Sequence, residues 1–325
     1  MRVLMVTSQL PSAAQPGTMA PVARQIESMR DVGIDVDVLE VTGARRLKYL
    51  HAVARVWERA AQVDLLHAHY GYCGWLARVQ LAKPIVVSFM GDDLLGTPDT
   101  DGRTTTASRL VVRANRRLAR IVDAVIVKSQ EMARIVAPVK AHVVPNGVDL
   151  QRFTPMEPAE ARRTLGWTDD RHYVLFPGNP AVPRKGHALA SAAVAHAAPR
   201  MPKPIELTTL RGISPLQVPL YMNACDAMLM TSLLEGSPNV VKEAMACNLP
   251  VVSVEVGDVS ELLAGVQGCA QCPRDAELLG TALSDLLARG QRTTGRAALQ
   301  RKGLDLTSVA NRVKTIYETV LDRRG

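Results

Sequence analysis

The sequence predicts an α/β protein built from two doubly wound, parallel-sheet domains. Three observations support this class: short apolar runs alternate with helical patterns, the runs are apolar on both faces, and the pattern restarts after Pro155 and Pro158. Such alternation is typical of βαβ units, and strands buried on both faces belong to parallel sheets. With 325 residues the chain also exceeds one core of about 100–200 residues, so two domains are expected.

The first half contains six predicted strands. The opening run Val3–Thr7 is followed by a Pro/Gly loop and by a helix over Ala20–Val32, which Gly33 closes. The strands predicted after this helix are Val36–Val41, Leu65–Ala68, Ile85–Phe89, Ala124–Val127 and Ala141–Val144. Each is short and bounded by turn residues. Since ligands of open parallel sheets bind beyond the carboxyl ends of the strands, we expect chemistry in the loops that follow them.

The second half repeats this arrangement. A helix over Ala159–Leu165 stops at Gly166. The strands predicted after it are Tyr173–Phe176, Ile205–Thr208, Ala227–Thr231 and Val251–Val254. We therefore predict an N-terminal domain over residues 1–155 and a C-terminal domain over 156–305. A final helix over 306–325 is predicted to pack back on the N-terminal domain.

The most informative segment runs from Ser232 to Ala246. A strand ends at Thr231, a loop with Gly236, Ser237 and Pro238 follows, and a helix begins near Asn239. Free N–H groups and the positive end of the helix dipole suit an anionic or hydroxyl-rich ligand. Glu235 and Glu243 flank this turn. Two readings stay open for each carboxylate: it contacts the ligand, or it only compensates the helix N-terminus.

The run EGSPNVVKEAMACNLPVV, with Glu235 and Glu243 eight residues apart, resembles the retaining glycosyltransferases of family 4. The resemblance implies the GT-B fold, in which two Rossmann-like domains face a central cleft, and a nucleotide-diphosphate sugar as donor. The loop from Gly178 to Gly186 is similar to the family's diphosphate loop and holds its lysine as Lys185. The segment Gly257–Glu261 resembles the loop where a glycine approaches the sugar. Pro16-Gly17-Thr18 lies where the family keeps a glycine-rich loop.

The resemblance also implies a set of site residues. The predicted catalytic residues are Lys185 and Glu235 on the donor side, with Asp93 and His69 on the acceptor side. The predicted donor-binding residues are Gly17, Asn179, Arg184, Lys185, Glu235, Gly236, Ser237, Pro238, Asn239, Val240 and Glu243. Lys185 can neutralise the charge that grows on a leaving diphosphate. For His69 a hydrogen-bonded structural role stays open, and Asp93 can equally be a helix N-cap. His67 and His69 alternate along a strand end, so we expect only one to face the cleft.

Two positions depart from the family pattern. Asn179 stands where many members have an arginine, and Met90 stands where many have a histidine before Gly91. One cation beside the diphosphate is therefore lost, which shifts its role toward Arg184 or Lys185. The family histidine's contact with the donor sugar has no counterpart at Met90.

The cysteines and the donor half give no sign of a metal or a cofactor. Cys269 and Cys272 form a CxxC, but no second CxxC or histidine pair lies nearby in the sequence, whereas structural zinc sites usually need four ligands. An odd total of five cysteines also argues against a disulfide framework. We predict a metal-independent enzyme that needs no cofactor besides its donor co-substrate.

The net charge of +8 indicates an anionic partner. Six arginines between Arg103 and Arg120 have no acidic residue among them, and a second basic cluster lies between Arg45 and Arg59. Ala44–Ala61 reads as an amphipathic helix with Leu47, Leu50, Ala54 and Trp57 as its apolar stripe. It either lies in an anionic membrane interface or packs that stripe inward as an ordinary surface helix.

We expect a cytoplasmic protein, peripheral on the inner face of the membrane if that helix binds lipid, because no signal peptide or apolar run of about 18 residues is present. Three phenylalanines without basic interleaving speak against nucleic acid. The predicted acceptor is a lipid-linked or envelope polysaccharide intermediate. A non-catalytic nucleotide-sugar-binding subunit and a nucleotide-sugar epimerase are the alternatives. The absence of GxGxxG after Thr7 disfavours an oxidoreductase.

Overall fold

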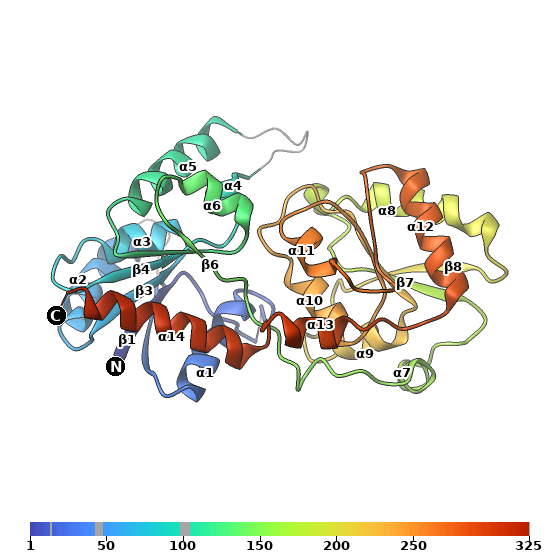
Figure 1. Cartoon of the computed structure of the whole chain (residues 1–325), viewed down its shortest axis with the longest axis horizontal. Helices are drawn as coiled ribbons and strands as arrows, with labels where there is room; N and C mark the ends of the chain where they lie inside the picture. Colours follow the sequence, from blue (N-terminus) through green and yellow to red (C-terminus); the bar gives the residue numbers. More distant parts are fainter. Residues whose placement is uncertain (14, 43–47, 98–104, 325) are drawn as a thin grey trace. The chain divides into compact units, whose positions relative to one another are not determined.

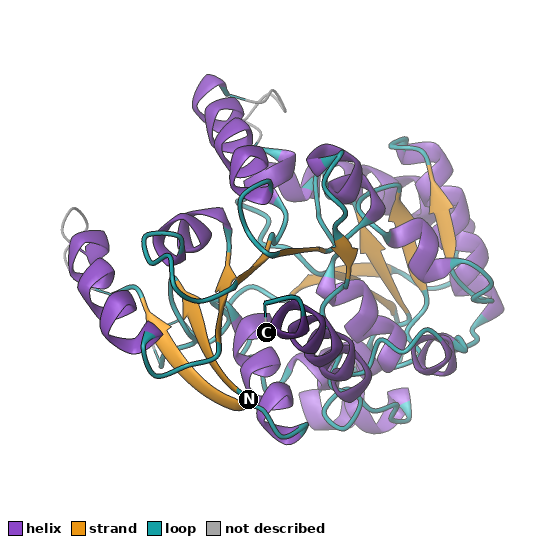
Figure 2. Cartoon of the chain, turned by 60° about the vertical axis from the view of Figure 1, so that its left-hand side comes forward, coloured by secondary structure: helices purple, strands orange, loops and turns teal. Residues whose placement is uncertain are grey.

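The computed structural model describes residues 1–13, 15–42, 48–97 and 105–324. Their contacts divide the chain into two compact units (Figure 1). Of the described residues, those up to Gly147 and those from Leu306 onward form unit 1, and Val148–Asp305 form unit 2. Each unit is a parallel sheet with helices on both faces (Figure 2).

Unit 1 contains a six-stranded parallel sheet in the order β2-β1-β3-β4-β5-β6. The strands are β1 Arg2–Thr7, β2 Asp35–Glu40, β3 Leu65–His69, β4 Ile85–Ser88, β5 Ala124–Val127 and β6 His142–Val143. The chain passes from β1 to β2 on one side and then returns to β3 on the other. The strand order therefore reverses between β1 and β3, where open α/β sheets bind ligands.

The helices of unit 1 cover two separate apolar layers. They are α1 Ala20–Asp31, α2 Lys48–Ala60, α3 Gly71–Ala77, α4 Asp92–Leu95, α5 Thr106–Ala119, α6 Gln130–Val136 and α14 Leu306–Asp322. Leu4 and Val6 belong to one layer, and their neighbours Val3 and Met5 belong to the other. This sorting follows from the two-residue period of a strand.

The C-terminal helix α14 is part of unit 1. Val309, Val313, Tyr317 and Val320 recur every three or four residues, are buried, and pack in the same layer as Val22 and Met29 of α1. Helical periodicity places these side chains on one face. The Lys314 ammonium also donates to the Val32 carbonyl at the end of α1, at 3.0 Å.

Unit 2 contains a five-stranded parallel sheet in the order β11-β10-β9-β7-β8. The strands are β7 His172–Phe176, β8 Ile205–Thr209, β9 Ala227–Met230, β10 Val251–Val254 and β11 Ala270–Cys272. The helices are α7 Pro158–Leu165, α8 His187–Ala197, α9 Val218–Ala224, α10 Asn239–Ala246, α11 Val259–Leu263, α12 Ala276–Arg289 and α13 Gly295–Arg301, with 3₁₀ turns at Pro183–Lys185 and Ala198–Arg200. Here the strand order reverses between β7 and β9.

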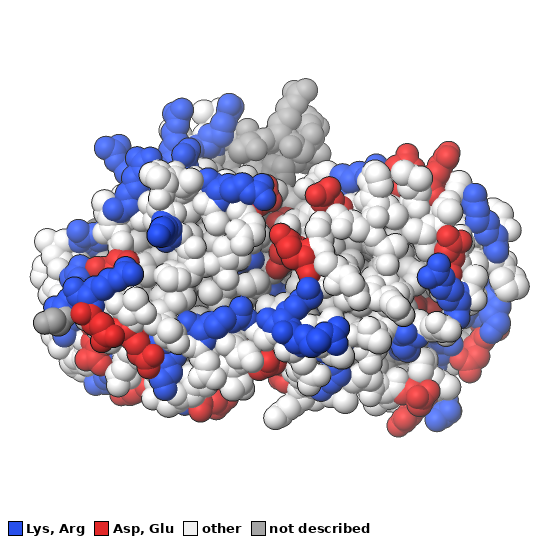
Figure 3. All heavy atoms as spheres, viewed as in Figure 1, with Lys and Arg blue, Asp and Glu red and all other residues white. Residues whose placement is uncertain are grey.

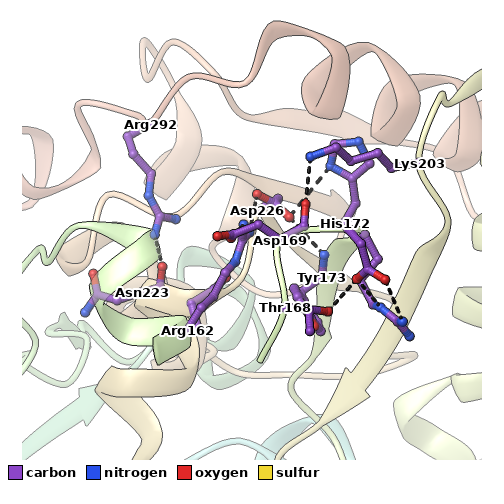
Figure 4. A network of polar contacts seen from close by, with 12 residues as sticks. Arg162, Thr168, Asp169, His172, Tyr173, Lys203, Asn223, Asp226 and Arg292 are labelled. Atoms are coloured by element: carbon purple, nitrogen blue, oxygen red, sulfur yellow. Dashed lines mark hydrogen bonds and ion pairs between the residues drawn. The ribbon is translucent and has the colours of Figure 1, made fainter. Parts of the chain in front are cut away.

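A network of charged side chains lies at the amino ends of the strands of this sheet (Figure 4). The Arg162 guanidinium donates to Asp226 at 2.7 Å and to Asp169 at 2.9 Å, and Asp226 accepts from the backbone N–H of Tyr173 at 2.8 Å. Tyr173 and Asp226 lie at the amino ends of β7 and β9. The network therefore ties α7 to the start of the sheet and lies at the opposite end from the ligand loops.

Candidate functional site

Two loops of unit 2 lie side by side at the carboxyl ends of β7 and β9. These strands are neighbours in the sheet, so the loops that follow them meet at the switch point. The Thr231 hydroxyl donates to the carbonyls of Lys185 and Gly186, at 3.1 and 3.0 Å. The Leu233 N–H donates to the Arg184 carbonyl at 2.8 Å. These bonds fix the two loops relative to each other.

Glycine is required where the loops touch. Gly186 has φ +72°, and a Cβ there would lie 2.3 Å from the Thr231 carbonyl oxygen. A side chain is therefore excluded both by backbone conformation and by space. At Gly178 a Cβ would lie 2.9 Å from the Lys185 Cβ. Gly178 thus lets the aliphatic stem of Lys185 pack directly on the loop backbone.

The two loops bring Lys185 and Glu235 into contact. The Lys185 ammonium donates to Glu235 Oε1 at 2.5 Å, and the Arg184 guanidinium lies 3.6 Å from the same oxygen. The side chains of Lys185 and Glu235 are 24% and 16% exposed. The pair is thus half-buried yet open to a ligand, and its two members were predicted separately from segments 50 residues apart.

The second loop leads into α10. This helix begins at Asn239, and no side chain caps its first N–H groups. The Val241 N–H donates to the Pro238 carbonyl at 3.2 Å. The positive end of the helix dipole lies at this turn and favours an anion there. Glu243 is half-buried one turn into the helix. The loop Glu235–Pro238 and the start of α10 thus have the local structure predicted from sequence.

Three buried polar side chains form a hydrogen-bonded network behind the Glu235–Pro238 loop. The Lys242 ammonium donates to the Ser237 hydroxyl at 2.9 Å, and that hydroxyl donates to Asp258 Oδ2 at 2.7 Å. Lys242 is fully buried and Asp258 is 5% exposed. Burial raises the pKa of the Asp258 carboxyl, while the nearby Lys242 charge and the Ser237 hydroxyl act in the opposite direction. Sequence analysis missed Lys242 and Asp258 as site residues, because nothing local shows that a lysine is buried.

Gly257 allows a close backbone contact with the same loop. It has φ +58°, and a Cβ there would lie 2.9 Å from the carbonyl oxygens of Glu235 and Gly236. The loop Gly257–Asp258 therefore packs backbone to backbone against the Glu235 loop. The approach of this glycine to a sugar, which the resemblance implies, stays a prediction.

The predicted residues of unit 1 have different surroundings. His67 and His69 are both fully buried, and their rings are 4.4 Å apart. The expectation that only one would face the cleft was wrong, because residues two apart on a strand lie on the same face. His67 is hydrogen-bonded to the Tyr317 hydroxyl at 2.5 Å and to the Ser88 hydroxyl at 2.8 Å.

Burial lowers the pKa of His69 to about 3, with a further contribution from the Lys128 charge. Among the described residues neither ring nitrogen of His69 has a hydrogen-bond partner. His69 is therefore a neutral ring in the core at physiological pH, and its predicted catalytic role gains no support from its position.

Asp93 holds a turn together. Its carboxylate accepts from the backbone N–H groups of Gly91 at 2.9 Å, Met90 at 3.0 Å and Gly71 at 3.3 Å. Burial raises its pKa to about 6, although these bonds act against that rise. The N-cap of α4 is Gly91, so Asp93 does not cap the helix in the usual way. The neighbouring Asp92 is the exposed carboxylate at this strand end.

Three further predicted positions lie in turns or loops. The Asn179 side chain accepts from the Ala181 N–H at 3.0 Å, so it shapes the turn before Lys185. Met90 packs at the edge of the layer formed by α1 and α14. Gly17 is exposed two residues before Met19, whose φ is 52°, and a Cβ on Gly17 would meet nothing within 4 Å.

The basic surface of unit 1 centres on α5. Arg109, Arg113, Arg116, Arg117 and Arg120 are exposed on or next to this helix, and Leu110 and Val111 are 59% and 51% exposed. Only Asn115, Leu118 and Ala119 of α5 are buried. Its first turns project from the body of the unit, and Lys and Arg side chains gather over it (Figures 1 and 3).

Helix α2 requires a correction. The predicted stripe included Ala54 and Trp57, but both are exposed, Trp57 by 56%, whereas Ala52, Val56 and Ala60 face the core. The smaller side chains fit against the sheet, so the aromatic ring points outward. Arg59 donates to Asp37 at 3.1 Å and to the Val38 carbonyl at 2.9 Å. Arg45, Arg46 and Leu47 lie outside the described residues, as does Arg103.

Metal ligands do not cluster in the part of the chain that the structure describes: it contains no group of three or more His, Cys, Asp or Glu side chains able to hold an ion. Cys269 and Cys272 are free thiols at β11. None of the described helices is long and apolar enough to cross a bilayer.

Comparison with known proteins gives the same answer for both units. Residues 6–152 match the family model Glycosyltransferase Family 4, and residues 197–289 match the model Glycosyl transferases group 1. The putative teichuronic acid biosynthesis glycosyltransferase TuaC of Bacillus subtilis is 26% identical over 87% of this chain and 88% of its own. A D-inositol 3-phosphate glycosyltransferase of Actinosynnema mirum is 30% identical over 60% of this chain and 56% of its own.

Solved structures agree on the fold. Sucrose-phosphate synthase of Thermosynechococcus elongatus superposes with a TM-score of 0.79 at 17% identity, covering 99% of both chains. Anabaena HepE in complex with UDP and glucose gives 0.74 at 19% identity, covering 98% of this chain and 99% of its own. The protein is therefore a glycosyltransferase with the GT-B fold. It belongs to family 4, as the resemblance of the EGSPNVVKEAMACNLPVV segment predicted. The glycosyltransferase matches of both units argue against the epimerase alternative, and a measurement of turnover separates an enzyme from a non-catalytic binding subunit.

Proposed function

We propose that the protein transfers a sugar from a nucleotide-diphosphate sugar, bound in unit 2, to a lipid-linked or envelope polysaccharide intermediate, with retention of anomeric configuration. The observation that carries the donor assignment is the Lys185–Glu235 contact beside the uncapped start of α10. Cations and free N–H groups are the partners that a diphosphate needs. The names of TuaC and of the UDP-bound HepE support the acceptor class and the donor class respectively.

In this proposal each residue has a distinct task. Lys185, assisted by Arg184, neutralises the charge that grows on the diphosphate as the glycosidic bond breaks. The positive end of the α10 dipole favours the diphosphate beside the Glu235–Pro238 loop, and Glu243 accepts from the ribose hydroxyls. Glu235 leaves its apo partner Lys185 when the donor binds and accepts hydrogen bonds from the sugar.

The donor is tested by a melting-temperature screen against a panel of nucleotide sugars and free nucleotides. Ligand at a hundredfold excess over its dissociation constant stabilises the folded protein by about 2.7 kcal/mol, so the true donor raises the Tm by several degrees. Release of free nucleotide from that donor, in the presence of a membrane extract as acceptor source, then checks turnover. A flat screen across the panel refutes the donor site.

We further propose that no metal takes part, because Lys185, Arg184 and backbone N–H groups supply the positive charge at the diphosphate. Transfer and donor hydrolysis are expected to continue unchanged in EDTA. The measurement is the initial rate before and after chelation and after addition of Mg²⁺ or Mn²⁺. A rate that collapses in EDTA and returns with either ion contradicts this assignment.

We propose peripheral binding of unit 1 to anionic membranes through α5. Each exposed arginine near an anionic surface contributes on the order of 1 kcal/mol, and this attraction weakens as salt shortens the Debye length. Changing Arg109, Arg113 and Arg116 together to Glu is expected to abolish co-sedimentation with vesicles containing anionic lipid. Wild type is expected to bind these vesicles at physiological salt and to detach at about 1 M salt.

The matched control makes the same change of charge in unit 2. Arg211, Arg289 and Arg301 are also exposed, and their joint change to Glu is expected to leave vesicle binding largely intact. If both triple variants lose vesicle binding equally, then binding depends only on the net charge of the protein, and α5 is not the membrane contact. Sedimentation with neutral vesicles to the same extent as with anionic ones would also reject the proposal.

A further inference from the structure

A pocket of about 370 Å³ lies within unit 2, at the amino ends of the strands and thus away from the two loops proposed to bind the donor. One side is formed by Val266–Cys269, which lead into β11, and the other by residues between Leu286 and Thr294, where α12 ends. A helix that follows a parallel strand runs back along the sheet, so the start of β11 and the end of α12 lie at the same edge. The volume falls in the range of small-molecule sites, about 300–1,000 Å³.

The polar side chains of this pocket favour an anion. Two of them are the guanidinium groups of Arg289 and Arg292, and Gln267, Gln291 and Thr294 add amide and hydroxyl groups. Of the described residues that line the pocket, none is acidic. Guanidinium groups bind phosphate oxygens through paired hydrogen bonds, whereas a cation in this pocket would meet two positive charges.

Arg292 is fixed by the backbone of unit 2. Its guanidinium donates to the Cys225 carbonyl at 3.0 Å and to the Asn223 carbonyl, next to the Arg162–Asp226 network (Figure 4). Burial lowers the pKa of Arg292, although the Asp226 charge acts in the opposite direction. Asp226 itself already accepts from Arg162 at 2.7 Å. The charge of Arg292 is thus only partly compensated, and an anion in the pocket would stabilise it.

Arg289 lies at the rim of the same pocket. It is exposed in the last turn of α12, and its guanidinium forms no ion pair with any of the described residues. An arginine at a helix C-terminus can also serve the helix dipole alone, so a control variant has to share that position. Together Arg289 and Arg292 bring one exposed and one half-buried guanidinium to one hollow.

We propose that this pocket is a second ligand site, which binds the phosphate group of a small phosphate ester between Arg289 and Arg292. The amides of Gln267 and Gln291 then face the hydroxyl groups of the ester. A free phosphate ion fills only a small part of about 370 Å³, given about 30 Å³ for each water-sized group, so an ester is favoured over inorganic phosphate. The site goes beyond the proposed function and does not depend on it, because it and the proposed donor loops lie at opposite ends of the strands.

The test titrates glycerol 3-phosphate, ribose 5-phosphate, inorganic phosphate and ribose into the full chain by calorimetry at constant ionic strength. We expect at least one of the two esters to bind at least tenfold more tightly than inorganic phosphate, and ribose not to bind. Inorganic phosphate that binds as tightly as both esters contradicts the ester assignment. Ribose that binds as tightly as ribose 5-phosphate contradicts the role of the arginines, and failure of both esters to bind overturns the proposal.

Two matched variants localise the site. Arg289→Gln is expected to weaken the binding of the ester at least tenfold. Arg301→Gln is expected to leave it unchanged, because Arg301 is likewise an exposed arginine in the last turn of its helix, α13, but does not line the pocket. Both positions are on the surface, so both variants are expected to fold. Equal losses in the two variants, or no loss in Arg289→Gln, overturn the site.

Lys185→Ala separates this pocket from the proposed donor loops, which a phosphate ester can also reach. Ester binding is expected to be unchanged in Lys185→Ala, and the donor-induced Tm shift is expected to be unchanged in Arg289→Gln. Loss of ester binding in Lys185→Ala places the probe at the donor loops and refutes this inference alone. A flat donor screen on the wild type refutes the proposed function, whatever the esters do.

Discussion

Lys185→Ala is expected to lower the rate of sugar transfer by at least about a hundredfold, equivalent to about 2.7 kcal/mol of transition-state stabilisation. The reason is geometric: Lys185 is the half-buried ammonium between the two donor loops, and Gly178 packs against its stem so that it is held in place. The loss is expected mainly in kcat, since the charge that Lys185 meets grows only as the bond to the leaving group breaks. The measurement is steady-state turnover with the donor found by the melting screen.

Two variants control this result. Lys203→Ala removes an exposed lysine at the far end of the same sheet, where it donates to the Asp169 carbonyl at 2.7 Å, and is expected to leave turnover unchanged. Glu243→Ala is expected to weaken the donor and the free nucleotide in parallel, with a smaller effect on kcat. Turnover of Lys185→Ala close to that of Lys203→Ala would remove Lys185 from the mechanism.

Asp258→Ala is expected to lower the free energy of unfolding of unit 2 by about 3–5 kcal/mol. The variant removes the carboxylate that is linked through the Ser237 hydroxyl to the fully buried Lys242 ammonium. Urea unfolding is followed by the fluorescence of Trp167, the tryptophan of unit 2, with Trp57 and Trp75 changed to Phe. The same variant is expected to bind the donor more weakly, since Ser237 then loses the group that anchors the Glu235 loop.

A double-mutant cycle separates charge from packing. Adding Lys242→Met to Asp258→Ala removes the buried ammonium as well, so the double variant is expected to be more stable than Asp258→Ala alone. Asp258→Asn, which can still accept from the Ser237 hydroxyl, is expected to fall between wild type and Asp258→Ala. If the losses in unfolding free energy of the two single variants simply add in the double variant, then Lys242 and Asp258 have no interaction energy.

Most of the fold could be read from the sequence, because its elements are encoded locally. Buried parallel strands such as Val3–Met5 and Ala227–Met230 are apolar on both faces, and glycines such as Gly33 and Gly166 mark helix ends. The edge strand β11 was not predicted, since Ala270–Cys272 is short and half-exposed and lacks the apolar run of a central strand. The inward face of α2 was also misjudged, because periodicity allowed two stripes and only packing against the sheet selected Val56 over Trp57.

The sequence by itself determined the family, the parallel-sheet class and the two loops proposed to bind the donor, because a motif and an alternating pattern are both properties of neighbouring residues. The tertiary structure alone decided which distant groups meet. It brought Lys185 to Glu235, buried Lys242 beside Ser237, and buried both His67 and His69 in the core. Contacts of this kind depend on the strand order and on the space left between packed elements. Neither of these can be predicted from a short segment of sequence.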